Sequence, residues 1–136
     1  MTSTSLAGDW AYRFSGFTIM ESTPCYLVGM GVLTLGADGT IKGKQTASIT
    51  PLTGTGQKLI HAGLEVSGTY STGDGVWGSS KLTFLDQNEN EVGTFDILHV
   101  DPDRFWMIST GAKQMPGSTP ADEVNSGEAV RIKPLN

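Results

Sequence analysis

The stretch LTLGADGTIKGK (residues 33–44) decides the fold, because apolar and polar residues alternate on both sides of an Asp-Gly pair. A period of two is the pattern of a β-strand with one buried face. Asp38-Gly39 is the strongest hairpin signal in the chain, since both central residues of a type I′ turn need positive φ. The stretch therefore predicts two antiparallel strands joined by a tight turn.

The same period of two recurs along almost the whole chain, and no window shows a sustained helical pattern. Glycine makes up 18 of the 136 residues, an abundance that favours short strands and tight turns over helices. We expect eight strands, over about residues 9–17, 25–36, 39–49, 58–71, 76–86, 92–100, 104–111 and 127–133. Closing such a meander removes its exposed edges. The prediction is a single all-β domain over residues 1–136, an eight-stranded antiparallel up-and-down barrel.

The predicted connections alternate in length. The short ones are Asp38-Gly39, Ser71–Gly75 and Asp101–Asp103. The long ones are Phe17–Pro24, Thr50–Gln57 and Gly111–Gly127. Because alternate connections of a meander lie at the same end, we expect a closed base and a loop-rich mouth. Loops as long as Gly111–Gly127 are usually functional or disordered, so we expect this one to act as a lid over the mouth, with a mobile loop of no function as the alternative.

Trp10 begins the first predicted strand at the base, and the last strand brings Arg131 to the same end. An arginine over an indole gains cation–π attraction and stacking. With Gly8, these residues resemble the base of the calycins, the superfamily of lipocalins, fatty-acid-binding proteins and avidins. Lipocalins begin with Gly-x-Trp and end with a basic residue that crosses the tryptophan. The chain departs from them in lacking a lipocalin-type C-terminal helix and an internal disulfide, so the resemblance is to the superfamily and to no named family.

Charge and composition restrict the partners. The net charge of −5 argues against nucleic acid or an anionic membrane surface, which would need a basic face. No stretch approaches the ~20 apolar residues of a membrane span. The N-terminus has neither the basic nor the apolar part of a signal peptide. The single cysteine, Cys25, fits a reducing compartment, so we expect a cytoplasmic protein, although a mature exported fragment would look the same.

Lysines indicate which face of a strand points outward, and the residues at the alternate positions are then expected to line the interior. The inward polar residues are Tyr12, Gln45, Tyr70, Ser80, His99 and Ser109. A few polar groups in an apolar cavity are how sites for small molecules are built; the alternative is that they bond to one another or to a buried water. The inward glycines Gly43, Gly68, Gly78 and Gly93 either permit barrel bends or leave a void.

We therefore predict binding of a small, mostly apolar molecule in the barrel. The expected ligand-binding residues are Phe14, Tyr26, Gln45, Val66, Ser80, Phe95, Met107 and Met115. One alternative is an isomerase or cyclase acting on an apolar substrate, with His99, Tyr12 and Tyr70 as catalytic candidates. Another is a ligandless structural or oligomerisation module. With two histidines and one cysteine, and no Walker A or G-x-S-x-G motif, we expect neither a metal nor a cofactor.

Several apolar residues fall in the predicted mouth loops, where such residues are uncommon. They are Phe17, Ile19, Met20, Leu52, Leu59 and Met115. This placement favours an apolar entrance to the barrel or a contact between copies in a homo-oligomer.

Overall fold

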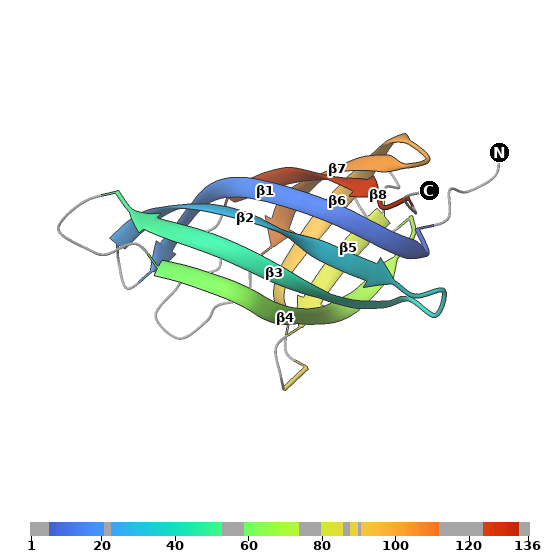
Figure 1. Cartoon of the computed structure of the whole chain (residues 1–136), viewed down its shortest axis with the longest axis horizontal. Helices are drawn as coiled ribbons and strands as arrows, with labels where there is room; N and C mark the ends of the chain where they lie inside the picture. The colour runs from blue at the N-terminus through green and yellow to red at the C-terminus, as the bar shows by residue number, and fades with distance from the viewer. Residues whose placement is uncertain are drawn as a thin grey trace.

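The computed structural model describes residues 6–20, 23–52, 59–73, 80–85, 88–89, 91–111 and 124–133. Its strands are β1 (Gly8–Met20), β2 (Thr23–Leu35), β3 (Thr40–Pro51), β4 (Leu59–Ser71), β5 (Ser80–Leu85), β6 (Glu91–Asp101), β7 (Arg104–Gly111) and β8 (Val124–Arg131). Each strand pairs antiparallel with its neighbours in sequence, and β8 pairs with β1, so the sheet closes into a barrel (Figure 1). The predicted eight-stranded antiparallel barrel is confirmed. Among the described residues no helix is long and apolar enough to cross a membrane.

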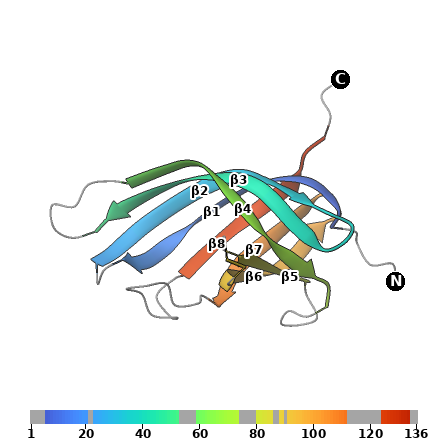
Figure 2. The same ribbon diagram turned by 90° about the horizontal axis from the view of Figure 1, so that it is seen from below.

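One end of the barrel is closed by tight turns and will be called the base. The β2–β3 and β6–β7 turns lie there, together with the start of β1 and the end of β8, at the right in Figure 1. Seen from below, the end of β4 reaches β5 at this same end of the barrel (Figure 2). In the described part of the chain, pairing between β4 and β5 runs only over Ser67–Ser71. The first half of β4 therefore lies toward the opposite end, the mouth.

The hairpin at residues 33–44 is present, but its turn differs from the predicted one. The strands separate at Leu35 and rejoin at Thr40, so the loop holds four residues instead of two. Only Gly39 has positive φ (89°), and its amide bonds to the Gly36 carbonyl. Asp38 instead accepts hydrogen bonds from the Thr40 amide and hydroxyl, which holds the loop open at this length. The type I′ prediction was therefore wrong, while the hairpin itself is confirmed.

The mouth carries fewer long loops than predicted. Phe17–Pro24 is not a loop, because β1 and β2 stay paired as far as Met20 and Thr23. The apolar residues predicted in that loop belong instead to β1, where each of them lies opposite a residue of β2. The last strand likewise starts at Val124, which pairs with Phe17, so Gly127 lies inside β8. Most of the predicted lid, residues 112–123, lies outside the described residues, as does most of the connection after β3.

The base half of the barrel is filled by its own side chains. The buried cluster there consists of Leu6, Trp10, Tyr12, Leu33, Leu35, Ile41, Leu82, Ile97, Phe105, Met107 and Ala129. The members on β1, β3, β5, β6 and β7 come from the faces that alternation predicted to point inward, whereas no inward face was predicted for β2 and β8, which supply Leu33, Leu35 and Ala129. Burial of large apolar side chains is the main favourable contribution to folding, so this half of the barrel supplies the core of the protein.

The inward glycines that the structure describes mark places where strands approach closely. A Cβ atom at Gly43 would lie 2.0 Å from the Val32 carbonyl oxygen, and one at Gly68 would lie 2.0 Å from that of Thr83. Both contacts are with backbone atoms, which cannot move aside cheaply. Of the two interpretations of these glycines, the structure supports bending of the barrel wall at Gly43 and Gly68. Gly78 lies outside the described residues.

Candidate functional site

Trp10 and Arg131 form the floor of the barrel, and the predicted contact between them is present. The guanidinium carbon lies 4.3 Å from the indole centroid. The Arg131 side chain also donates to the Ala7 carbonyl (2.8 Å) and pairs with Asp103 (3.1 Å). Trp10 is fully buried and donates its indole N–H to the Leu6 carbonyl. These contacts close the barrel at the base.

The central polar feature of the interior is a pair formed by Tyr12 and Gln45. Both residues lie opposite Gly31, on the two strands that flank β2. The Tyr12 hydroxyl donates to Gln45 Oε1 over 2.6 Å. A Cβ at Gly31 would lie 2.9 Å from that hydroxyl, so glycine leaves room for the pair to form. Burial raises the pKa of Tyr12 well above its ordinary value, which keeps the hydroxyl protonated as a donor.

Gln45 has hydrogen-bonding capacity left over. Its carbonyl oxygen accepts from Tyr12, whereas the described residues offer its amide nitrogen no acceptor. The side chain is only partly buried, so this nitrogen is not sealed in the core. An inward amide donor fixed by a buried tyrosine is the kind of polar group that orients a small molecule in an apolar site.

Apolar side chains surround this pair on the inner wall. We call Phe14, Val66, Phe84 and Phe95 the inner ring; all four are partly buried and pack on the core cluster. Phe14 stacks on Tyr12, with ring centroids 6.1 Å apart and planes 12° from parallel. Phe84 and Phe95 meet edge to face at 5.8 Å. The inner ring therefore marks the level at which the core cluster of the base ends. Toward the mouth on β2 and β3, Cys25, Leu27, Ala47 and Ile49 form a second buried cluster, which also packs against Phe14.

The wall next to the inner ring is accessible on β4. Leu64 lies opposite Gln45 on the face that lines the interior, yet 46 % of its surface is exposed. Among the described residues, no strand pairs with the free edge of β4 at this level. The interior is thus reachable near the Tyr12–Gln45 pair.

The predicted ligand-binding residues divide into four groups. Phe14, Gln45, Val66 and Phe95 lie on the inner wall at the level just described, and Ser80 begins β5 on the same face. Met107 also faces inward but is buried in the core below them. Tyr26 is placed differently from the prediction, because its position in β2 points outward, where it contacts Phe17 at 5.4 Å. Met115 lies outside the described residues.

The three catalytic candidates have separate partners. Tyr12 bonds to Gln45, and Tyr70 donates to the Gly36 carbonyl in the turn at the base. His99 sits between aromatic rings, 6.3 Å from Trp10 and 6.0 Å from Phe105. Its Nε2 is buried without a hydrogen-bond partner among the described residues. The described contacts therefore do not join the three side chains into one acid–base network.

A set of apolar residues on the outside of the barrel was not predicted from the sequence. Val28, Met30 and Val32 on β2, and Trp106 and Ile108 on β7, are exposed and point outward. The signal was available: in TPCYLVGMGVLTL (residues 23–35), apolar residues occupy both alternating faces, which indicates a strand covered on two sides.

Comparison with known proteins supports the fold alone. No family model matches the chain, and no curated protein matches it. Among solved structures, the chain is similar to a de novo designed fluorescence-activating β-barrel, with a TM-score of 0.54 and 12 % sequence identity. The match covers 97 % of this chain and 100 % of the designed one. The protein is accordingly an antiparallel β-barrel of eight strands, with a filled base. In the described part of the chain, no cluster of His, Cys, Asp and Glu has the make-up of a metal site.

Proposed function

We propose that the protein binds a small, mostly apolar molecule on the inner wall, between the inner ring and the mouth. The observation that carries this proposal is the Tyr12–Gln45 pair. It places one oriented amide donor among the partly buried apolar side chains of the inner ring. Such sites combine apolar contact area, which supplies affinity, with a few fixed polar groups, which supply orientation. The ligand we infer is an apolar molecule with one hydrogen-bond acceptor.

The base adds a second supporting feature. The Gly8, Trp10 and Arg131 contacts close the barrel in the manner that the resemblance to calycins implies, and we extend the resemblance to an interior ligand site. The isomerase or cyclase alternative gains no comparable support, since its three candidate groups have separate partners.

A fluorogenic apolar dye carrying a carbonyl group tests the proposal directly. The fluorescence-activating character of the designed barrel guides this choice of probe. Titration of the dye into the protein is expected to give saturable fluorescence. It is also expected to raise the melting temperature with dye concentration, because a ligand that binds only the folded state stabilises it by mass action.

Two matched variants separate the interior from the outer surface. Val66→Trp fills space at the inner ring, and Ser67→Trp adds the same side chain to the outward face of the same strand. We expect Val66→Trp to weaken dye binding at least about tenfold, while Ser67→Trp binds as the unmodified protein does. Equal binding by both variants, or no saturable binding at all, would overturn the interior site.

A further inference from the structure

The outward side chains of four neighbouring strands form three rows across the barrel wall. The registers of β2, β1, β8 and β7 set each row. The middle row reads Met30, Arg13, Glu128 and Trp106 in order. The row on the mouth side reads Val28, Ser15, Ser126 and Ile108, and the base-side row reads Val32, Ala11, Val130 and Arg104. An ion pair thus lies at the centre of this outer face, with apolar side chains on both sides.

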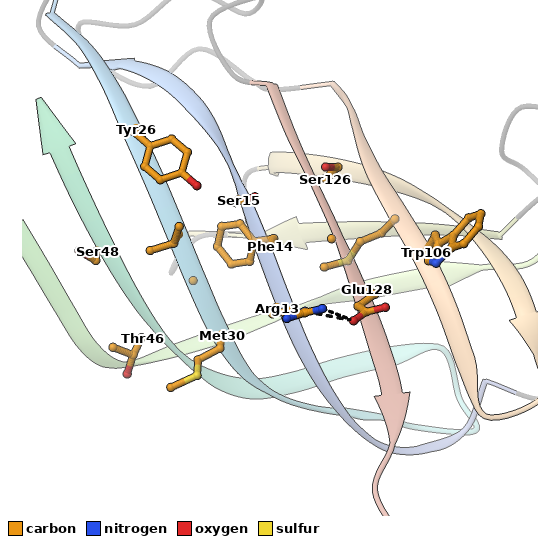
Figure 3. Close-up of a pocket in the computed structure, with 14 residues that line it drawn as sticks. Arg13, Phe14, Ser15, Tyr26, Met30, Thr46, Ser48, Trp106, Ser126 and Glu128 are labelled. Atoms are coloured by element: carbon orange, nitrogen blue, oxygen red, sulfur yellow. Dashed lines mark hydrogen bonds and ion pairs between the residues drawn. The ribbon is translucent and has the colours of Figure 1, made fainter. Parts of the chain in front are cut away.

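The close-up in Figure 3 shows this arrangement, with the Arg13–Glu128 pair between Met30 and Trp106. The two charged groups approach to 2.7 Å. Met30 is 67 % exposed and Trp106 is 54 % exposed. The face is hollowed into a groove of about 900 Å³, and a second hollow of about 510 Å³ adjoins it over Arg13, Met30 and Glu128. Large apolar side chains that stay this exposed around a groove are typical of an interaction surface.

The size of the outer face fits a protein interface. Exposed apolar side chains on β2, β7 and β8 lie on both sides of the Arg13–Glu128 pair, so the face spans four strands. A standard complex buries about 800 Å² on each partner. Tryptophan, methionine and arginine, which meet here in one row, are also the residues enriched in interfaces.

The charges on the face indicate which partner fits. The chain carries a net charge of −5, yet the middle row is neutral because Arg13 and Glu128 balance one another. The row is also self-complementary. A two-fold axis in the plane of the face, running between β1 and β8, sets Arg13 of one copy opposite Glu128 of the other. The same axis sets Met30 opposite Trp106, and sulfur–aromatic contacts are favourable.

We propose that this outer face joins two copies of the chain about that two-fold axis. Each Arg13 then meets a carboxylate from both copies, and each Trp106 ring is covered by a methionine. The association leaves the barrel mouth free, but Phe14 borders the first hollow and Tyr12 and Gln45 border the second, so the face adjoins the residues of the proposed interior site.

Sedimentation velocity over a range of protein concentrations tests the association. We expect a reversible dimer whose dissociation constant rises at least about tenfold in Met30→Lys and in Trp106→Lys, because lysine at either position sets an unpaired charge against an apolar partner. Thr69→Lys is the control, since Thr69 is exposed on β4 at the base end and lies opposite Thr40 and Thr83, away from this face. A chain that stays monomeric at every concentration, or a dimer equally weakened by Thr69→Lys, overturns the proposal.

Charge reversal tests the axis itself. R13E and E128R each break the ion pair within a chain and place like charges opposite one another in a dimer of identical copies. We expect both variants alone to be predominantly monomeric. Mixed in equal amounts they are expected to dimerise, because each altered residue then faces the opposite charge on its partner. Circular dichroism is used to check that each variant is folded. Absence of this rescue overturns the two-fold arrangement.

Discussion

The Arg131 guanidinium lies over the Trp10 indole, with its central carbon 4.3 Å from the ring centroid, and joins the first and last strands at the base. The cation also bonds to the Ala7 carbonyl and pairs with Asp103 in the β6–β7 turn. Three segments distant in sequence thus converge on one guanidinium. A planar group with five donors is suited to this role in a way that a lysine ammonium is not.

The first prediction concerns the indole. Trp10→Ala is expected to lower the free energy of unfolding by about 3–5 kcal/mol, since it removes a fully buried side chain and leaves a cavity beneath Arg131. Urea unfolding followed by circular dichroism measures the change. Trp106→Ala is the matched control, and at protein concentrations where the chain is monomeric it is expected to cost less than about 1 kcal/mol. Similar losses in the two variants would contradict this account of the base.

The second prediction concerns the backbone beside that contact. Gly8 has φ of 131°, and a Cβ there would lie 2.7 Å from an Arg131 nitrogen. Gly8→Ala is therefore expected to destabilise the barrel through both backbone strain and displacement of the guanidinium, by about 2–3 kcal/mol. Gly63→Ala separates the two causes. Its φ is 63° with open space around it, so only the strain of about 1 kcal/mol applies. If Gly63→Ala costs as much as Gly8→Ala, crowding at Arg131 is not significant.

The architecture could be predicted from sequence because one face of most strands is apolar and the other is not. In β3, the alternation of Ile41, Lys42, Gly43 and Lys44 determines both the strand and its inward side. The ends of the strands could not be predicted in the same way. Phe17, Ile19 and Met20 carry no signal that separates a strand from an apolar loop, and only pairing with β2 shows that they belong to a strand.

The candidate site was predictable as a set of inward residues but not as a pair. Alternation places Tyr12 and Gln45 on the inner wall, whereas their contact depends on inter-strand register. That register follows from loop length, and the β2–β3 loop proved to be four residues long. The outer face escaped prediction for a related reason. Alternation identifies the apolar face of a strand that points inward, but it does not predict a second, outward apolar face, and Met30 and Trp106 lie on such a face.

The third prediction is a dependence of stability on pH. Hydrogen bonds from Lys133 and Arg131 hold the pKa of the Asp103 carboxyl below its ordinary value of 3.8. The ion pairs therefore contribute fully above about pH 4 and are lost as the pH falls through the lower folded-state value. Unfolding measured at a series of pH values is expected to show that Asp103→Asn is less stable than the unmodified protein at neutral pH. The difference between them should shrink in acid. Lys133→Met should reduce the same acid-dependent loss, and equal pH slopes in all three proteins would show that Asp103 is not linked to folding.

The last prediction tests the polar group of the proposed site. Gln45→Met keeps the length of the side chain but removes the amide nitrogen that no described residue accepts from. A neutral hydrogen bond contributes about 1 kcal/mol, so affinity for an apolar dye with a carbonyl group is expected to fall about five- to tenfold. A hydrocarbon dye of similar size lacks the acceptor and should bind both proteins alike.

Lys44→Met, on the outward face one residue away, is the control for a change in strand β3 itself. Gln45→Met also leaves the buried Tyr12 hydroxyl without its acceptor at a cost of about 1–3 kcal/mol, so binding is compared well below the melting temperature of each variant. If Gln45→Met weakens both dyes equally, Gln45 shapes the cavity and does not orient the ligand.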